Sequence, residues 1–127
     1  MFDLEKCRDL LSALAEKRGE DIIALRLGET ASLVDVFVLV TGNSEVHMKT
    51  LMDAAEESLR RQGCDVRPEG ENSANWRLLD AGNIAVHVFS RKGREFYKIE
   101  KLWEDAEALH YDDGQEDGKN TGKKTEM

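Results

Sequence analysis

The segment of this chain that comes closest to a chemical motif is Gly42-Asn43-Ser44, between an apolar run and an amphipathic one. Backbone N–H groups at the start of a helix can hold a phosphate, so this turn suggests nucleotide binding. Nucleotidyl transfer would also need paired carboxylates on a nearby strand to hold magnesium, but Asp35 stands alone and no predicted strand carries Asp-x-Asp. The sequence therefore favours a strand-to-helix turn in which Ser44 caps the helix, and it keeps a nucleotide-binding or nucleotidyltransferase-like enzyme as the alternative.

Other residue types that carry chemistry are scattered along the chain. A metal site needs three or four converging ligands, and the histidines and cysteines show no such spacing. These residues are His47, His87, His110, Cys7 and Cys64. His87 alternates with valines inside an apolar run, which indicates a packed or partner-facing side chain. No nucleophile motif surrounds any serine, and we expect no catalytic residue, no metal and no cofactor.

A tryptophan, Trp76, follows a polar, turn-prone segment and begins a short apolar run. In a strand, residues 76, 78 and 80 share one face, so Trp76, Leu78 and Asp80 would form an apolar stripe that ends in an acid. The indole could pack under helices as part of the core. Alternatively it could be an exposed anchor at an interface, with Asp80 and Glu69 meeting basic residues of a partner.

Hydrophobic spacing and turn residues divide the chain into helices and strands. Helices are expected over residues 3–18, 44–62 and 94–109, where apolar residues recur at steps of three or four. Strands are expected over 22–27, 34–41, 64–67, 76–79 and 84–90. The last two strands form a hairpin, and the middle helix is a crossover. The order predicts an α/β (α+β) fold with a mixed sheet flanked by helices.

The last predicted helix combines aromatic and basic residues. Its aromatic and large apolar residues, at helical spacing, favour a role in the core: Phe96, Tyr97, Ile99, Leu102 and Trp103. Its basic residues are interleaved with glutamates: Lys92, Arg94, Lys98 and Lys101 with Glu95 and Glu100. That pattern is typical of a solvated face with paired charges rather than of an RNA-binding patch.

The 127 residues suit one domain, which we place at 1–109, followed by a polar tail over 110–127 that we expect to be disordered. A net charge of −8 argues against wrapping bare nucleic acid and suits a basic protein partner. No secretory signal and no apolar run of membrane-spanning length is recognisable, so we expect a cytoplasmic protein with reduced thiols.

Four segments together resemble the ribosomal silencing factor family, RsfS, also called Iojap. They are Val34–Ser44, Glu69–Trp76, Asp80–Phe89 and Arg94–Trp103, in the family's order and spacing. The resemblance covers about residues 3–106. Asn43, Asn83 and the stretch 91–93 depart from residues that are frequent in the family.

The resemblance implies a fold related to nucleotidyltransferases but without their catalytic carboxylates. It also implies a factor that binds ribosomal protein fourteen of the large subunit at the face that meets the small subunit. Bound there, the factor would block subunit joining and repress translation under nutrient limitation. The partner-binding positions that carry over are Glu69, Ser73, Asn75, Trp76 and Asp80, with His87 and Ser90 on the neighbouring strand. An alternative use of the Trp76 face is contact with a second copy of the chain in a homodimer.

Overall fold

The computed structural model describes residues 4–27, 35–70, 73–98, 101 and 107–111. The elements, in chain order, are α1 (Leu4–Glu16), β1 (Glu20–Arg26), β2 (Val36–Gly42), α2 (Glu45–Arg61), β3 (Arg67–Glu69), β4 (Trp76–Asp80), β5 (Ile84–Ser90), α3 (Arg91–Tyr97) and β6 (Glu107–Tyr111). Among these residues, no helix is both long and apolar enough to cross a membrane.

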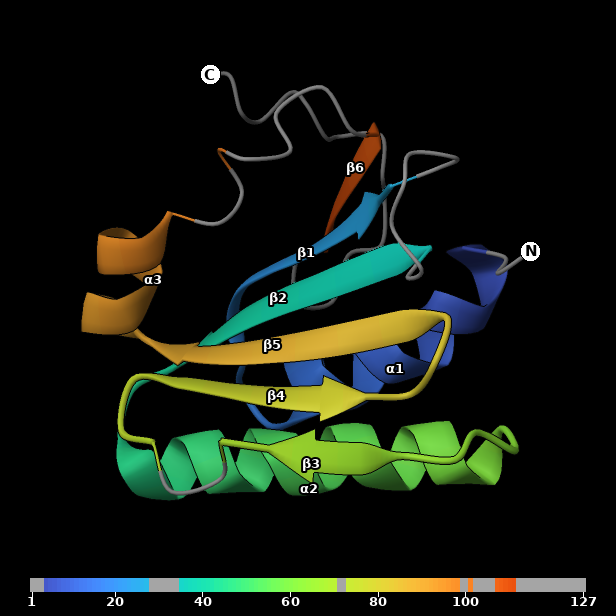
Figure 1. The fold of residues 1–127 in the computed structure, drawn as a ribbon, viewed down its shortest axis with the longest axis horizontal. Coiled ribbons are helices and arrows are strands. Elements are labelled where there is room, and N and C mark those ends of the chain that lie inside the picture. Colours follow the sequence, from blue (N-terminus) through green and yellow to red (C-terminus); the bar gives the residue numbers. More distant parts are fainter. Residues whose placement is uncertain (1–3, 28–34, 71–72, 99–100, 102–106, 112–127) are drawn as a thin grey trace.

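The strands form one mixed sheet in the order β3-β4-β5-β2-β1-β6 (Figure 1). β2 and β5 run parallel in the centre, and the other neighbouring pairs are antiparallel. Parallel strands need a crossover, and α2 lies in the connection from β2 to β5. β4 and β5 form a hairpin, in whose turn the Ala81 amide donates to the Ile84 carbonyl at 2.9 Å. The mixed sheet, the crossover helix and the hairpin are thus confirmed.

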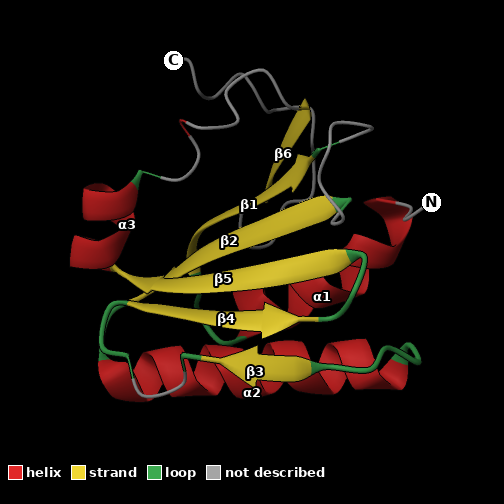
Figure 2. Ribbon diagram, in the orientation of Figure 1, coloured by secondary structure: helices red, strands yellow, loops and turns green. Residues whose placement is uncertain are grey.

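Helices α1 and α2 cover one face of the sheet (Figure 2). Leu10, Leu11 and Leu14 of α1 pack there against valines of β2 and β5, together with a stripe of α2 formed by Met48, Leu51 and Leu59. The opposite face holds a smaller cluster around Leu39 and Phe89. β2 therefore has side chains in both clusters, as its nearly continuous apolar sequence predicts.

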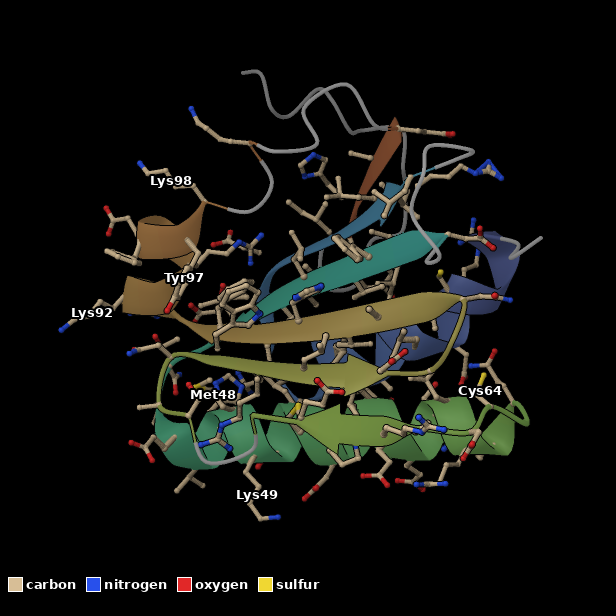
Figure 3. The ribbon with its side chains drawn as sticks, viewed as in Figure 1. Met48, Lys49, Cys64, Lys92, Tyr97 and Lys98 are labelled. Atoms are coloured by element: carbon tan, nitrogen blue, oxygen red, sulfur yellow. The ribbon has the colours of Figure 1, made fainter. Side chains whose placement is uncertain are left out.

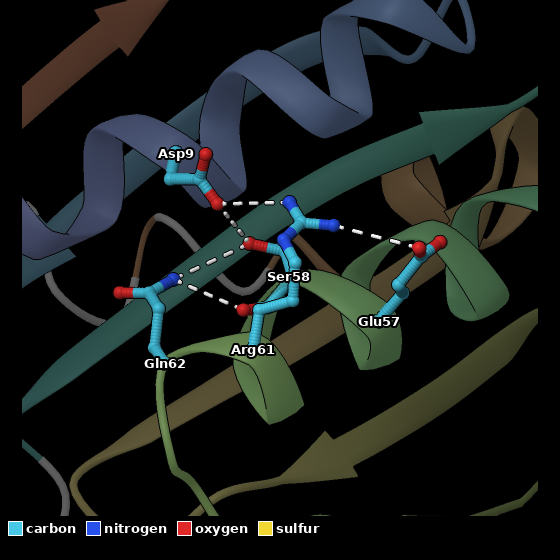
Figure 4. A network of polar contacts seen from close by, with 5 residues as sticks. All are labelled: Asp9, Glu57, Ser58, Arg61 and Gln62. Atoms are coloured by element: carbon cyan, nitrogen blue, oxygen red, sulfur yellow. Dashed lines mark hydrogen bonds and ion pairs between the residues drawn. The ribbon is translucent and has the colours of Figure 1, made fainter.

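A polar network joins α1 to α2 at the edge of this core (Figure 4). Asp9 Oδ2 accepts hydrogen bonds from Ser58 Oγ at 2.9 Å and from Arg61 Nη2 at 3.1 Å. Gln62 Nε2 donates to the Ser58 hydroxyl and carbonyl oxygens, each at 3.3 Å, and Arg61 also pairs with Glu57. Because Ser58 is fully buried, these bonds remove the cost of desolvating its hydroxyl. The network thereby stabilises the packing of α1 on α2.

The third strand lies further along the chain than expected. The sequence predicts residues 64–67, but the strand is β3, Arg67–Glu69, with Pro68 at its centre. A proline has no N–H to donate, and a strand tolerates it at the edge of a sheet. β3 is the outermost strand, so the missing donor costs no pairing there.

The prediction of one helix over 94–109 is wrong at both ends. Helix α3 begins at Arg91, and it ends at Tyr97 because Lys98 adopts a left-handed backbone with φ of 46°. Glu107–Tyr111 form β6, which pairs antiparallel with β1. Leu109 and Tyr111 alternate onto the main core, a period of two that a helix cannot satisfy. Ile99, Glu100, Leu102 and Trp103 lie outside the described residues.

The strand β6 also includes His110, which the sequence assigns to the polar tail. The division into a domain over 1–109 and a tail over 110–127 stays a prediction, because residues 112–127 lie outside the part of the chain that the structure describes.

Candidate interaction surface

Strand β4 places Trp76 on the sheet face opposite α1 and α2. Residues 76, 78 and 80 of this strand are half-buried, whereas Arg77 and Leu79 are buried on the other face. Leu79 joins the core under the helices, while Trp76 packs against the cluster around Leu39 and Phe89. The alternation expected from the sequence is confirmed, and the possibility that Trp76 packs under these helices is wrong.

Aromatic rings surround the indole of Trp76. Phe89 stacks on it with ring centroids 5.4 Å apart and an angle of 26° between the planes. Tyr97 of α3 reaches it from the side, at 4.6 Å and 50°. Figure 3 shows Tyr97 pointing from α3 toward the sheet. Phe89 is buried and Trp76 is only partly covered, so part of the indole faces solvent.

Phe96 extends this surface. Its ring meets Tyr97 edge-on at 4.9 Å, and 76% of the residue is exposed. Tyr97 is 42% exposed. We call Trp76, Phe96 and Tyr97 the aromatic patch. The predicted core role of Phe96 is therefore wrong, and that of Tyr97 holds only for its contact with Trp76 and Phe89.

His87 lies beneath the indole. Trp76 Nε1 donates to His87 Nδ1 at 3.0 Å, so the neutral imidazole carries its hydrogen on Nε2. The residue is 5% exposed, and Phe37 packs edge-on against its ring at 4.6 Å. Nε2 is buried and makes no hydrogen bond to any described residue. Burial lowers the pKa of His87 from 6.5 to about 4. Of the two roles that the sequence left open, the structure supports a packed side chain that orients Trp76.

Ser73, Asn75 and Ser90 shape the backbone around the indole. Ser73 Oγ accepts from the amides of Asn75 and Trp76, both at 3.2 Å. Ser90 Oγ donates to Asn75 Oδ1 at 2.8 Å and accepts from the Gly93 amide at 2.9 Å, which caps α3. These bonds hold the start of β4 against the start of α3. The three residues thus fix the distance between Trp76 and Tyr97.

The close approach of these two segments requires a glycine. A Cβ placed on Gly93 would collide with the carbonyl oxygen of Asn75, which belongs to the backbone and cannot rotate away. Gly93 is buried at this contact. The sequence Arg-Lys-Gly-Arg therefore lets α3 lie against the strand and present its aromatic residues beside Trp76.

The two candidate acids are not adjacent to the indole. Asp80 shares its strand face but lies four residues along β4, or about 13 Å at 3.3 Å per residue. Its Oδ1 accepts from the Gly82 amide at 3.0 Å and so shapes the hairpin turn. Glu69 is exposed on the edge strand β3, opposite Leu78. Glu69 and Asp80 thus lie along β3 and the end of β4, away from the Phe96 side of the patch, and Arg67 of β3 lies opposite Asp80.

The Gly42–Ser44 turn leads from β2 into α2. Ser44 caps α2, and its Oγ accepts from the His47 amide at 3.0 Å. The Asn43 amide donates to His47 Nδ1 at 2.9 Å, and the Met48 amide donates to the Ser44 carbonyl. Among the described residues, no three His, Cys, Asp or Glu side chains converge on a possible metal site. The expected helix cap is confirmed, and the amides of Asn43, His47 and Met48 bond within the chain.

The family model and the curated relative that match this chain both carry the name ribosomal silencing factor. A family model described as "Ribosomal silencing factor during starvation" matches residues 3–127. The ribosomal silencing factor RsfS of Halalkalibacterium halodurans is 33% identical over 107 residues, which cover 84% of this chain and 92% of the relative. A crystal structure of a protein from Chromobacterium violaceum has a TM-score of 0.76 at 34% identity, covering 82% of this chain and 88% of that one.

A more distant relative is the Mus musculus protein named mitochondrial assembly of ribosomal large subunit protein 1. It is 26% identical over 106 residues, which cover 80% of this chain and 45% of that protein.

Proposed function

The chain belongs to the ribosomal silencing factor family, and we propose that it binds the large ribosomal subunit through ribosomal protein fourteen. Bound at the face that meets the small subunit, it acts as an obstacle to subunit joining. It thereby represses translation in the cytoplasm under nutrient limitation, without catalysing a reaction and without reading a nucleic-acid sequence.

The observation that carries this proposal is the aromatic patch. Trp76 is held by Phe89, His87 and Tyr97, and yet it keeps part of its ring open to solvent. Such a ring loses little side-chain freedom on binding, and tryptophan and tyrosine are enriched among the residues that dominate interface energies. A rigid, partly exposed indole beside an exposed phenylalanine is therefore suited to anchoring a protein partner.

The candidate residues fall into two roles under this proposal. Trp76 contacts the partner directly, with Phe96 and Tyr97 beside it, while Glu69 and Asp80 meet basic side chains at the rim. Ser73, Asn75, His87 and Ser90 hold the patch in shape through hydrogen bonds within the chain.

Sedimentation tests the proposal. The protein should travel with purified large subunits and reduce the fraction of joined ribosomes when small subunits are added. Trp76→Ala should weaken large-subunit binding by about 2 kcal/mol or more, which is about 30-fold. Val46→Ala is a matched control, because Val46 is 77% exposed on α2, the helix on the other side of the sheet. If the protein does not sediment with large subunits, the proposed function is wrong. If a folded Trp76→Ala variant binds with unchanged affinity, the aromatic patch is not the binding surface.

Self-association through the aromatic patch would compete with ribosome binding. Light scattering of the isolated protein, with and without large subunits, measures whether a dimer forms and whether it dissociates as subunits bind.

A further inference from the structure

A basic pocket of about 420 Å³ lies beside α3, on the side of this helix away from Trp76. Its walls come from the start of β1, the end of β2, and α3 with the residues that follow it. The lining residues are Glu20, Asp21, Thr41, Arg91, Arg94, Glu95, Lys98 and Lys101. The pocket sits where the parallel strands β2 and β5 end, the edge at which open α/β sheets bind ligands.

An irregular stretch of β1 shapes this pocket. The pairing of β1 with β2 shifts between Glu20 and Ile23, and Asp21 adopts a left-handed φ of 50°. The Asp21 carbonyl accepts a hydrogen bond from Arg94 Nη2 at 2.9 Å. Arg94 Nη1 donates to Thr41 Oγ1 at 2.8 Å, and Thr41 is 1% exposed. The Arg94 guanidinium is thereby fixed in the pocket wall. Strained non-glycine residues and bulges occur preferentially at functional sites.

Positive charge exceeds negative charge in this pocket, although the whole chain carries −8. Arg91 and Glu20 form two hydrogen bonds, at 2.9 and 3.0 Å, and their charges offset each other. Arg94, Lys98 and Lys101 then outnumber Asp21 and Glu95. Neither lysine forms an ion pair with any residue that the structure describes. The predicted pairing of these charges stays a prediction, because Glu100 lies outside the residues that the structure describes.

We propose that this pocket binds a phosphate group, held by Lys98 and Lys101 and oriented by Arg94. Arginine offers a planar fork that matches phosphate oxygens, and lysine ammonium groups add mobile donors at the rim. The phosphate can belong to an RNA backbone or to a free nucleotide. The site is separate from the aromatic patch and does not depend on the proposed function.

Amide chemical shifts of the isolated, isotope-labelled protein test the site by NMR. Inorganic phosphate, ATP and a short single-stranded RNA are titrated at constant ionic strength, with chloride as the reference anion. Saturable shifts are expected at Thr41, Arg94 and Lys98. Stronger binding of the RNA would identify a backbone phosphate, and stronger binding of ATP would identify a nucleotide.

The double variant Lys98→Gln with Lys101→Gln removes two positive charges from the pocket and leaves Arg94 in place. It should weaken phosphate binding by about tenfold or more, as expected for charge-assisted hydrogen bonds. The matched control is Lys92→Gln with Lys49→Gln, which removes the same charge outside the pocket. Lys92 and Lys98 point away from each other, and Lys49 lies on α2 (Figure 3). Absence of saturable shifts with all three ligands, or equal weakening in both double variants, would overturn the proposal.

Discussion

The protein should lose stability in mild acid because of His87. The unfolded chain binds a proton on this residue near pH 6.5, whereas burial lowers the pKa in the folded protein to about 4. Between these values the unfolded state holds more protons, so the free energy of unfolding falls as the pH falls. The neighbouring side chains Trp76, Phe37 and Phe89 supply no negative charge that would favour the imidazolium.

The size of this loss follows from the gap between the two pKa values. They lie about 2.5 pH units apart, and each unit corresponds to about 1.4 kcal/mol, so His87 should account for about 3 kcal/mol between pH 7 and pH 4. Its contribution to stability is complete above pH 6.5 and is lost progressively down to about pH 4. A loss of this size is a large fraction of the stability of a small domain.

Urea unfolding followed by circular dichroism at several pH values measures the effect. The variant His87→Phe keeps an aromatic ring but does not titrate, and Trp76 Nε1 loses its acceptor at every pH. The difference in unfolding free energy between wild type and variant should therefore change by about 3 kcal/mol from pH 7 to pH 4, since the other groups titrate in both proteins.

A control variant, His110→Gln, replaces an exposed histidine of β6. Parallel stability curves for wild type and His87→Phe across the whole pH range would refute the reasoning, because they would mean that the buried imidazole does not resist protonation.

Three further substitutions test which residues hold the aromatic patch in place and whether Phe96 is exposed. Gly93→Ala should destabilise the fold by about 1–3 kcal/mol in urea unfolding, because its new Cβ would press on the Asn75 carbonyl; wild-type stability would show that the two segments can separate freely. Ser90→Ala should lower thermal stability by about 1–2 kcal/mol through loss of the α3 cap and of the bond to Asn75, and no change would mean that water replaces both bonds. Phe96→Ala should leave the stability within about 0.5 kcal/mol and weaken large-subunit binding, whereas clear destabilisation would place its ring in the core.

Local sequence patterns were sufficient for much of the sheet. The continuous apolar run of β2 and the paired runs of β4 and β5 specify strands whose neighbours are close in sequence or joined by one crossover. The alternation along β4 also placed Trp76 and Leu79 on opposite faces.

The C-terminal strand β6 could not be predicted in the same way, because its structure depends on pairing with β1, which is distant in the sequence. Residues 107–111 pair with 22–26, a contact that no local spacing reveals, although Leu109 and Tyr111 alternate as strand residues do. The helical spacing of the aromatic residues predicts a helix that continues past Lys98, but the left-handed backbone of Lys98 ends the helix there.

Part of the candidate site was predictable and part was not. Trp76 stood out by its type and position, but its neighbours Tyr97 and His87 come from other elements and meet it only in the folded chain. The basic pocket likewise combines three distant segments, and Glu20 pairs with Arg91 there although the two lie 71 residues apart in the sequence.

Pro68 also influences how copies of this protein meet. The outermost strand β3 is three residues long, and its central residue has no N–H to offer to an additional strand. Two molecules therefore gain little by joining their sheets along this border, and runaway stacking into fibres is disfavoured. Growth by sheet extension needs a free strand at both edges of the molecule, and β3 hinders it at one of them.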